Sequence, residues 1–371
     1  MSEKWHCEGV GSLLRPPELI EARRLYATGE LTAAEFKHVE DAAAESAIAM
    51  QLDAGLDVIG DGEMRRASWM SPFADAFDGF DRTTGVVMPW RDESGQRLET
   101  PGRRPVVVDR LRRRHSPATL EEWVFLRGRA ALGGRPPRPA KITIPGAEMA
   151  AAMYDDRLSR DAYPTREDYH AHVVELLRSE VSELVRLGCR YIQLDSPQYG
   201  ALTDPQNREL FRASGSDPDR LIDAGIEMDN AIIDGFPGVT FGLHICRGNA
   251  MSRFYAAGGY EPVARIFTRA RFGRFLLEYD DGRSGGFEPL RHVPVDRVVV
   301  LGLVTTKKPV LEDAAAVRAR VEEAARLVSL DRLALSPQCG FASVAAGNRI
   351  DPAGQAAKLS LVCGVARDIW P

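Results

Sequence analysis

Several features that would assign a chain to a well-known class are missing here. No apolar run approaches the roughly 18 residues of a membrane helix, and residues 1–6 lack the apolar core of a signal peptide. No basic run with interleaved aromatic residues occurs, and the formal net charge is −5. The GxGxxG fingerprint of dinucleotide-binding proteins is also absent. We therefore expect a cytoplasmic protein that binds neither membranes nor nucleic acid.

Cysteine is scarce, and the five cysteines are scattered along 371 residues. An odd number without regular spacing is not a disulfide framework, and in the cytoplasm reduced thiols are the default, some of which bind metal. Cys189, at a predicted helix–strand junction, and Cys363, on the last predicted helix, have the positions of packing cysteines. Cys7 precedes the first predicted strand, and this position does not indicate whether the residue packs in the core or binds metal. Cys246 and Cys339 lie at the ends of apolar strands, where metal binding is an option.

Short apolar segments alternate with helical patterns about eight times, which predicts a parallel α/β fold. Eight such units in 371 residues favour a closed (β/α)8 TIM barrel over an open doubly wound sheet. The strands are predicted near residues 8–14, 56–59, 141–144, 191–195, 239–246, 274–280, 298–304 and 333–340. The helices are predicted over residues 32–54, 165–187, 219–235, 259–270, 311–328 and 353–367.

No linker or internal repeat divides the chain, so we expect a single domain over residues 1–371 with an N-terminal helical elaboration. An irregular stretch rich in Arg, Gly and Pro, about residues 80–137, is predicted to be an insertion. Within it we expect a hairpin formed by residues 86–90 and 105–108. Two roles stay open for this insertion: it covers the active site, or it forms the contact of a homo-oligomer.

A candidate metal site follows from the strand pattern. His244 and Cys246 are two residues apart on one strand, so their side chains point to the same side. In a barrel, active-site residues lie at the C-terminal ends of strands, which adds Glu278, Asp280 and Cys339. A His, two Cys and a carboxylate suit zinc better than magnesium or calcium, which prefer oxygen ligands. The alternative is a buried His beside a packed Cys.

A thiolate-rich zinc site can bind a further thiol and hold it as the thiolate, so alkyl transfer to sulfur is a natural use. Hydrolysis through zinc-bound water is the main alternative, although hydrolytic sites more often use three His or two His and a Glu.

The motifs resemble the C-terminal catalytic barrel of cobalamin-independent methionine synthase, over about residues 8–370. These motifs are Gly11-Ser12, Asp61-Gly62-Glu63, Gln193-Leu194-Asp195, His244-Ile245-Cys246, Glu278 and Pro337-Gln338-Cys339-Gly340.

The resemblance implies a reaction in which the homocysteine sulfur takes a methyl group from a folate and methionine forms. It implies that homocysteine is held by the loop of Gly11 and Ser12 together with Glu63 and Asp195. It also implies four zinc ligands, which by motif are His244, Cys246, Glu278 and Cys339.

The chain departs from the full-length enzyme in two ways. It is long enough for one barrel instead of two, and residues 141–146 lack the Trp that helps to place the folate in that family. The methyl donor is thus open among a folate, a methylated corrinoid protein and a small sulfonium or ether compound. The chain is also similar to short methionine synthase-like proteins with a single barrel, and to the epoxyalkane:coenzyme M transferases.

Our leading hypothesis is a zinc-dependent thiol alkyltransferase that methylates homocysteine. Asp195 and Glu63 orient the amino acid, and Arg247 or Arg283 binds an anionic group of donor or acceptor. The alternative is zinc-dependent transfer of another thiol, such as coenzyme M, to an epoxide, which would leave Asp195 and Glu63 without an ammonium partner. A metal-free decarboxylase-like barrel and a zinc-storage protein are two further hypotheses.

Overall fold

The computed structural model describes residues 5–83, 90–98, 104–129 and 137–371. At its centre lies a parallel sheet in the order β10-β9-β8-β7-β6-β5. The strands are short, and most of their residues are apolar and buried, as expected where helices cover a parallel sheet. Their bounds are β5 Ile142–Pro145, β6 Tyr191–Asp195, β7 Thr240–Ile245, β8 Arg274–Glu278, β9 Val298–Val304 and β10 Leu333–Pro337.

Two short extended stretches close this sheet into a ring. Cys7 forms a parallel bridge with Leu335 of β10, and Glu8 forms one with Val58. Ile59 in turn bridges Ala140, directly before β5, and the Lys141 N–H donates to the Ile59 carbonyl at 2.9 Å. Six strands and these two stretches make the eight positions of a (β/α)8 barrel, which confirms the predicted fold.

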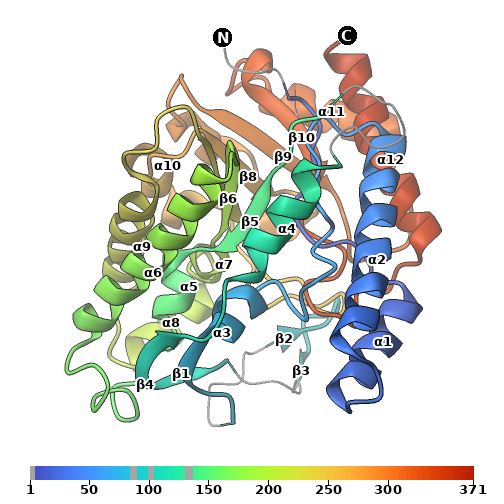
Figure 1. Ribbon diagram of the computed structural model, residues 1–371. Helices are drawn as coiled ribbons and strands as arrows, with labels where there is room; N and C mark the ends of the chain where they lie inside the picture. The colour runs from blue at the N-terminus through green and yellow to red at the C-terminus, as the bar shows by residue number, and fades with distance from the viewer. Residues whose placement is uncertain (1–4, 84–89, 99–103, 130–136) are drawn as a thin grey trace.

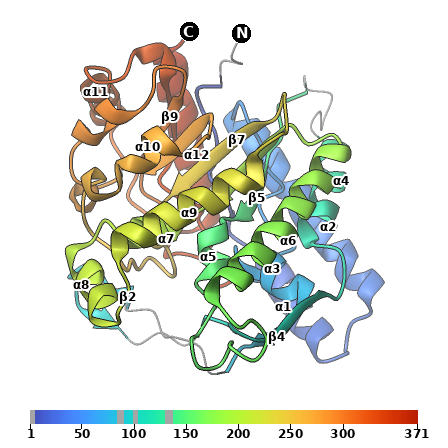
Figure 2. The same cartoon turned by 90° about the vertical axis from the view of Figure 1, so that its left-hand side faces the viewer.

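Helices form the outer layer around the strands (Figures 1 and 2). Two of the longest begin where capping boxes predict: Thr32 and Glu35 cap α2, and Thr165 and Asp168 cap α6. None of the helices in the described ranges is both long and apolar enough to cross a membrane. The helices are α1 Pro17–Ala27, α2 Ala33–Ala54, α3 Ser71–Ala76, α4 Ala118–Arg127, α5 Ala147–Ala151, α6 Arg166–Arg186, α7 Pro197–Ala201, α8 Pro205–Ala213, α9 Pro218–Ile233, α10 Arg265–Arg269, α11 Ala314–Ala324 and α12 Pro352–Ile369.

Two predicted helices are shorter than expected. The segment predicted over 259–270 consists of a 3-10 turn, Glu261–Val263, and the short α10. The segment predicted over 311–328 contains only α11, Ala314–Ala324, whose N-cap is Asp313. Local charge patterns favoured longer helices, and packing against the barrel decides their length.

A buried charge cluster closes the N-terminal end of the barrel. Glu8 accepts from Lys141 Nζ at 2.6 Å and from Arg274 at 2.8 and 3.0 Å, and the Tyr191 hydroxyl donates to it at 2.9 Å. Burial alone would raise the pKa of Glu8, but Lys141 and Arg274 lower it. Because each charge is paired, this cluster ties several strands together and is structural.

The insertion pairs its strands differently from the prediction. β4 (Val106–Arg113) pairs antiparallel with β1 (Phe77–Asp81), and β2 (Trp90–Arg91) pairs with β3 (Arg97–Leu98). The hairpin predicted from residues 86–90 and 105–108 is therefore wrong for its described part; residues 86–89 lie outside the described ranges. The reason is apolar packing, since Phe77, Val106 and Val107 are all buried.

β2 is fixed to the C-terminal end of the barrel. The Arg91 N–H donates to the Phe254 carbonyl at 2.7 Å, and its guanidinium pairs with Asp204 at 2.9 Å. The Trp90 ring meets the Tyr255 ring edge to face at 5.2 Å. This part of the insertion thus lies beside the loops that follow the barrel strands, where the candidate site is found.

Candidate metal and substrate site

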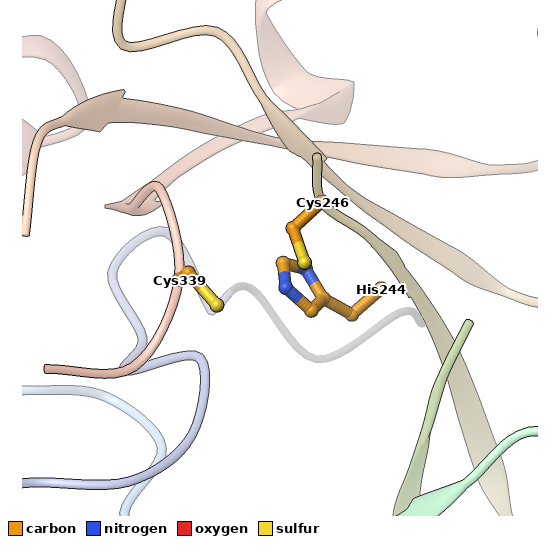
Figure 3. A group of neighbouring side chains, drawn as sticks. All are labelled: His244, Cys246 and Cys339. Atoms are coloured by element: carbon orange, nitrogen blue, oxygen red, sulfur yellow. The ribbon is translucent and has the colours of Figure 1, made fainter. Parts of the chain in front are cut away.

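Three of the four predicted metal ligands meet at the C-terminal ends of β7 and β10. One nitrogen of His244 and the sulfurs of Cys246 and Cys339 all lie within 4.8 Å of one another, and all three residues are buried. Figure 3 shows the side chains of this cluster pointing toward one another. The alternation of side chains along β7 brings His244 and Cys246 to the same side, as predicted.

The geometry of this His–Cys–Cys cluster fits a zinc ion. Tetrahedral zinc with bonds of about 2.0–2.3 Å separates its ligand atoms by about 3.5–3.8 Å, which small shifts from the observed arrangement would reach. His244 Nδ1 lies 3.1 Å from the Leu276 carbonyl, which fixes Nδ1 as the protonated nitrogen. His244 Nε2 is buried and has no hydrogen-bond partner in the described structure. The neutral imidazole would therefore offer the Nε2 lone pair to a metal.

The two thiols of the cluster differ in acidity. The pKa of Cys339 is lowered well below its ordinary value, first because the Cys246 thiol donates a hydrogen bond to it, and then because His244 lies beside it. The pKa of Cys246 is raised for the matching reason, with burial adding to the effect. One thiolate is thus already favoured before any cation arrives, as a metal ligand requires.

Glu278, the fourth predicted ligand, lies outside the three-residue cluster. Its carboxylate accepts from the Arg247 backbone N–H at 2.7 Å and lies 3.4 Å from Arg283 and 3.5 Å from Lys307. Burial would raise the pKa of Glu278, but Lys307, Arg283 and Arg247 lower it to about 2. The side chain is therefore ionised, yet cationic neighbours hold it.

A cavity of about 410 Å³ extends from the His–Cys–Cys cluster, and we call it the mouth cavity. Its lining brings together the predicted substrate residues Gly11, Ser12, Glu63 and Asp195. Ser12 is buried, and a Cβ on Gly340 would lie 2.7 Å from the Ser12 backbone nitrogen. Only glycine at position 340 therefore allows the first strand and the Cys339 segment to approach this closely.

Glu63 is held in an unusual backbone conformation, with φ of +57°. Its Oε1 accepts from Thr143 Oγ1 at 2.9 Å, while Oε2 is buried without a partner among the described residues. A Cβ on Gly11 would lie 3.1 Å from Glu63 Oε1, so the first strand passes close to this carboxylate. An unsatisfied buried carboxylate oxygen that borders a cavity is suited to a cationic ligand group.

Asp195 completes the acidic side of the mouth cavity. Its Oδ1 accepts from Gln193 Nε2 at 2.7 Å. Burial raises the pKa of Asp195 to about 7; Glu63 acts in the same direction, and His244 acts against it. Glu63 and Asp195 both border the mouth cavity and form an acidic pair suited to an ammonium group, although Glu63 Oε1 also lies 3.5 Å from Arg66.

The structure places Arg247, predicted to bind an anionic group of donor or acceptor, outside the lining of the mouth cavity. Its guanidinium is fully buried and donates to the Gly258 carbonyl at 2.7 and 2.8 Å and to the Tyr260 hydroxyl at 3.1 Å. The reason is strand alternation: when Cys246 faces the cavity, its neighbour faces away. Arg283 likewise pairs with Asp281 at 2.7 Å, stacks on Phe254 and does not border the mouth cavity.

Several residues that line the mouth cavity were missed from the sequence. They come from irregular segments without helix or strand periodicity, so the sequence does not indicate which of their side chains point toward the site. The break at Gly248 directly after the His244 strand was a signal that the following loop, residues 248–255, could reach the site. The missed residues are Trp90, Arg104, Met149, Gln198, Asn249, Met251, Arg253 and Tyr255.

Fold and site together define an α/β barrel with a buried His–Cys–Cys cluster and paired carboxylates at its C-terminal end. The family model "Cobalamin-independent synthase, Catalytic domain" matches residues 7–212, and the chain belongs to this family. The matched segment includes Ser12, Glu63 and Asp195 but ends before His244. Family membership makes the chain a methyltransferase of the methionine synthase type, which confirms the predicted family.

Relatives match nearly the whole chain. "Uncharacterized protein YxjH" of Bacillus subtilis (strain 168) is 36% identical over 369 residues, covering 99% of this chain and 95% of the relative. "Methionine synthase" of Pyrococcus horikoshii is 23% identical over 332 residues, covering 90% and 85%. A B12-independent methionine synthase from Shewanella sp. W3-18-1, solved with selenomethionine, has a TM-score of 0.74 at 20% identity, covering 99% and 97%. The last comparison supports the fold alone.

Proposed function

We propose that the protein is a zinc-dependent methyltransferase that converts homocysteine to methionine. One observation carries the proposal: the donor atoms of His244, Cys246 and Cys339 lie within 4.8 Å of one another at the wall of a cavity that also contains Glu63 and Asp195. Zinc at this cluster would lower the pKa of an incoming thiol and keep it as the thiolate.

Other residues of the site would orient the zinc ligands and bind homocysteine. His244 is oriented by the Leu276 carbonyl, so that Nε2 faces the cluster. Glu63 and Asp195 bind the homocysteine ammonium group, and the Ser12 hydroxyl with the neighbouring backbone binds its carboxylate. Glu278 is the fourth, exchangeable ligand, because it is ionised and close by but already has cationic partners. The selenomethionine complex of the Shewanella protein supports an amino-acid ligand in a barrel of this shape.

We further propose that residues 1–371 form one catalytic domain, in which the insertion of about residues 80–137 borders the mouth cavity. The alternative activity, transfer of coenzyme M to an epoxide, is less well supported. Coenzyme M carries a sulfonate and no ammonium, so it would offer no ammonium partner to the acidic pair of Glu63 and Asp195.

The test begins with metal analysis and continues with thiol binding. One zinc per chain and a new sulfur neighbour in the zinc X-ray absorption spectrum with homocysteine would support the proposal. A response to coenzyme M alone would favour the epoxide reaction, and a protein that binds no zinc would refute both.

Cys339→Ser should abolish stoichiometric zinc, because one of the three clustered donors is lost. Cys363→Ser is the matched control: it replaces another buried cysteine, but one on α12 in the hydrophobic core. Full zinc in Cys339→Ser would mean that the site is elsewhere.

A further inference from the structure

Two arginines that line the mouth cavity, Arg104 and Arg253, have no counter-ion among the described residues. Within the described ranges, neither guanidinium has a hydrogen-bond or ion-pair partner, and Arg253 Nε is buried without one. Many other arginines of the chain are paired with carboxylates, including the buried Arg66 and Arg274. Two unpaired cations beside a cavity are therefore unusual for this protein and point to an anionic ligand.

The segment that carries Arg253 is held in a strained conformation. Met251 and Ser252 have φ values of +53° and +65°, which side chains other than glycine rarely adopt. Such strain persists only where the surroundings enforce it. Here the Ser252 N–H donates to Asn348 Oδ1 at 2.8 Å, and Asn348 Nδ2 donates to Asn249 Oδ1 at 2.8 Å.

Further contacts hold this loop from both sides. Asn249 Nδ2 donates to the Gly340 carbonyl at 2.6 Å, directly after Cys339. Phe254, next to Arg253, exchanges two backbone hydrogen bonds with Arg91 of the insertion, at 2.7 and 3.1 Å. The loop that carries Arg253 is thus hydrogen-bonded to the segment after Cys339 on one side and to the insertion on the other.

We propose that Arg104 and Arg253 form an anion subsite that recognises the methyl donor. The inference rests on the proposed function, and it narrows the donor to a molecule with at least one carboxylate, phosphate or sulfonate group. A cationic sulfonium donor does not fit, because it would face two guanidinium groups without counter-ions. Trp90 and Tyr255 also border the cavity, so the body of the donor is apolar or aromatic.

The acceptor does not account for the two arginines. Homocysteine brings one ammonium and one carboxylate, for which the Glu63–Asp195 pair and Ser12 are already placed. A cavity of about 410 Å³ lies in the range that takes drug-sized ligands and exceeds the needs of one small amino acid. We therefore assign the remaining cavity volume and the two arginines to the methyl donor, the second substrate.

The experiment uses a matched pair of fluorescent probes, because the donor is unidentified. Anilinonaphthalene sulfonate is an aromatic anion, and N-phenylnaphthylamine is its neutral counterpart without the sulfonate. We expect Arg104→Met with Arg253→Met to weaken binding of the sulfonate by about tenfold or more and to leave binding of the neutral probe within about twofold. Arg253→Lys keeps the charge and should retain most of the affinity.

Arg220→Met is the control, since it removes an exposed arginine from α9 and should change neither probe. Equal loss of both probes in the double variant would indicate a distorted cavity and overturn the proposal, as would unchanged binding of the sulfonate. Zinc content and homocysteine binding, followed at the zinc absorption edge, separate the two proposals. If the double variant loses homocysteine as well, the arginines serve the acceptor and the subsite assignment is wrong. If the wild type binds no zinc but the probe difference holds, the proposed function fails and the anion subsite stands.

Discussion

Gly200→Ala should distort the His–Cys–Cys cluster, because the added methyl group would meet the backbone of Cys246. Gly200 lies in α7, directly after β6, and packs against the end of β7. A Cβ at this position would overlap the carbonyl oxygen of Cys246 and lie 2.8 Å from its carbonyl carbon. Both are backbone atoms, so they cannot rotate away as a flexible side chain would. Either α7 or the backbone of Cys246 must shift.

The size of the effect follows from two opposed terms. Overpacking a core costs about 1–3 kcal/mol, whereas replacing a helical glycine by alanine gains about 0.4–1 kcal/mol where the conformation allows it. We therefore expect a net destabilisation of about 1–2 kcal/mol, measured by urea unfolding. Because metal sites tolerate displacements of only about 0.5 Å, zinc affinity measured by chelator competition should also fall by about tenfold.

Gly364→Ala provides the matched control. Gly364 also lies in a helix, α12, but a Cβ there meets no atom within 4 Å. This variant should be as stable as the wild type or slightly more stable, with unchanged zinc. If Gly200→Ala were equally stable and bound zinc fully, the close packing of α7 against Cys246 could not be what positions the cluster.

Two further substitutions test charges around the site and in the outer layer. Lys307→Met should make zinc bind about tenfold more tightly, because Glu278 loses a cationic partner 3.5 Å away that holds its carboxylate off the cluster. Homocysteine should then bind more weakly, because its sulfur must displace a more tightly bound Glu278. Lys308→Met removes an exposed neighbouring lysine and should change neither affinity, and weaker binding of both zinc and homocysteine in Lys307→Met would indicate a distorted site. Glu180→Gln tests a pH dependence. Burial raises the pKa of Glu180 to about 7, although Thr119 donates to it, so its stabilising contribution is present below pH about 4.5 and is lost as the pH rises through about 7. Between pH 5 and 8 the wild type should lose stability relative to the variant in thermal unfolding, and a constant difference would contradict the assignment.

The sequence predicted the repeating part of the fold because that part follows local rules. Thr32 and Thr165 mark helix starts through capping boxes, and the runs of apolar residues mark strands buried on both faces. His244 and Cys246 were predicted to be together because strand periodicity alone decides it. Ring closure needed more, since the stretches at Cys7 and Val58 are too short to recognise without their partners.

Irregular segments carry the residues that the sequence did not predict. The position of Arg253 depends on Asn348, almost a hundred residues later in the chain, and on the positive φ angles of Met251 and Ser252, which no local sequence pattern predicts. β4 pairs with β1, which the sequence did not predict, because pairing partners depend on which apolar faces the barrel leaves to be covered. Such choices are made by tertiary contacts, which a single sequence does not display.

Glu278 shows the same limit at the centre of the site. Its type and its place at a strand end predicted a metal ligand, and both are as expected. Its partners, however, come from three other segments: the Arg247 N–H after β7, Arg283 after β8 and Lys307 after β9. A zinc ion would have to compete with these partners for the carboxylate, whereas His244, Cys246 and Cys339 already face one another. Under the proposed function, the same neighbours would stabilise Glu278 once a thiolate displaced it, so their weakening of this ligand would also favour binding of the substrate sulfur.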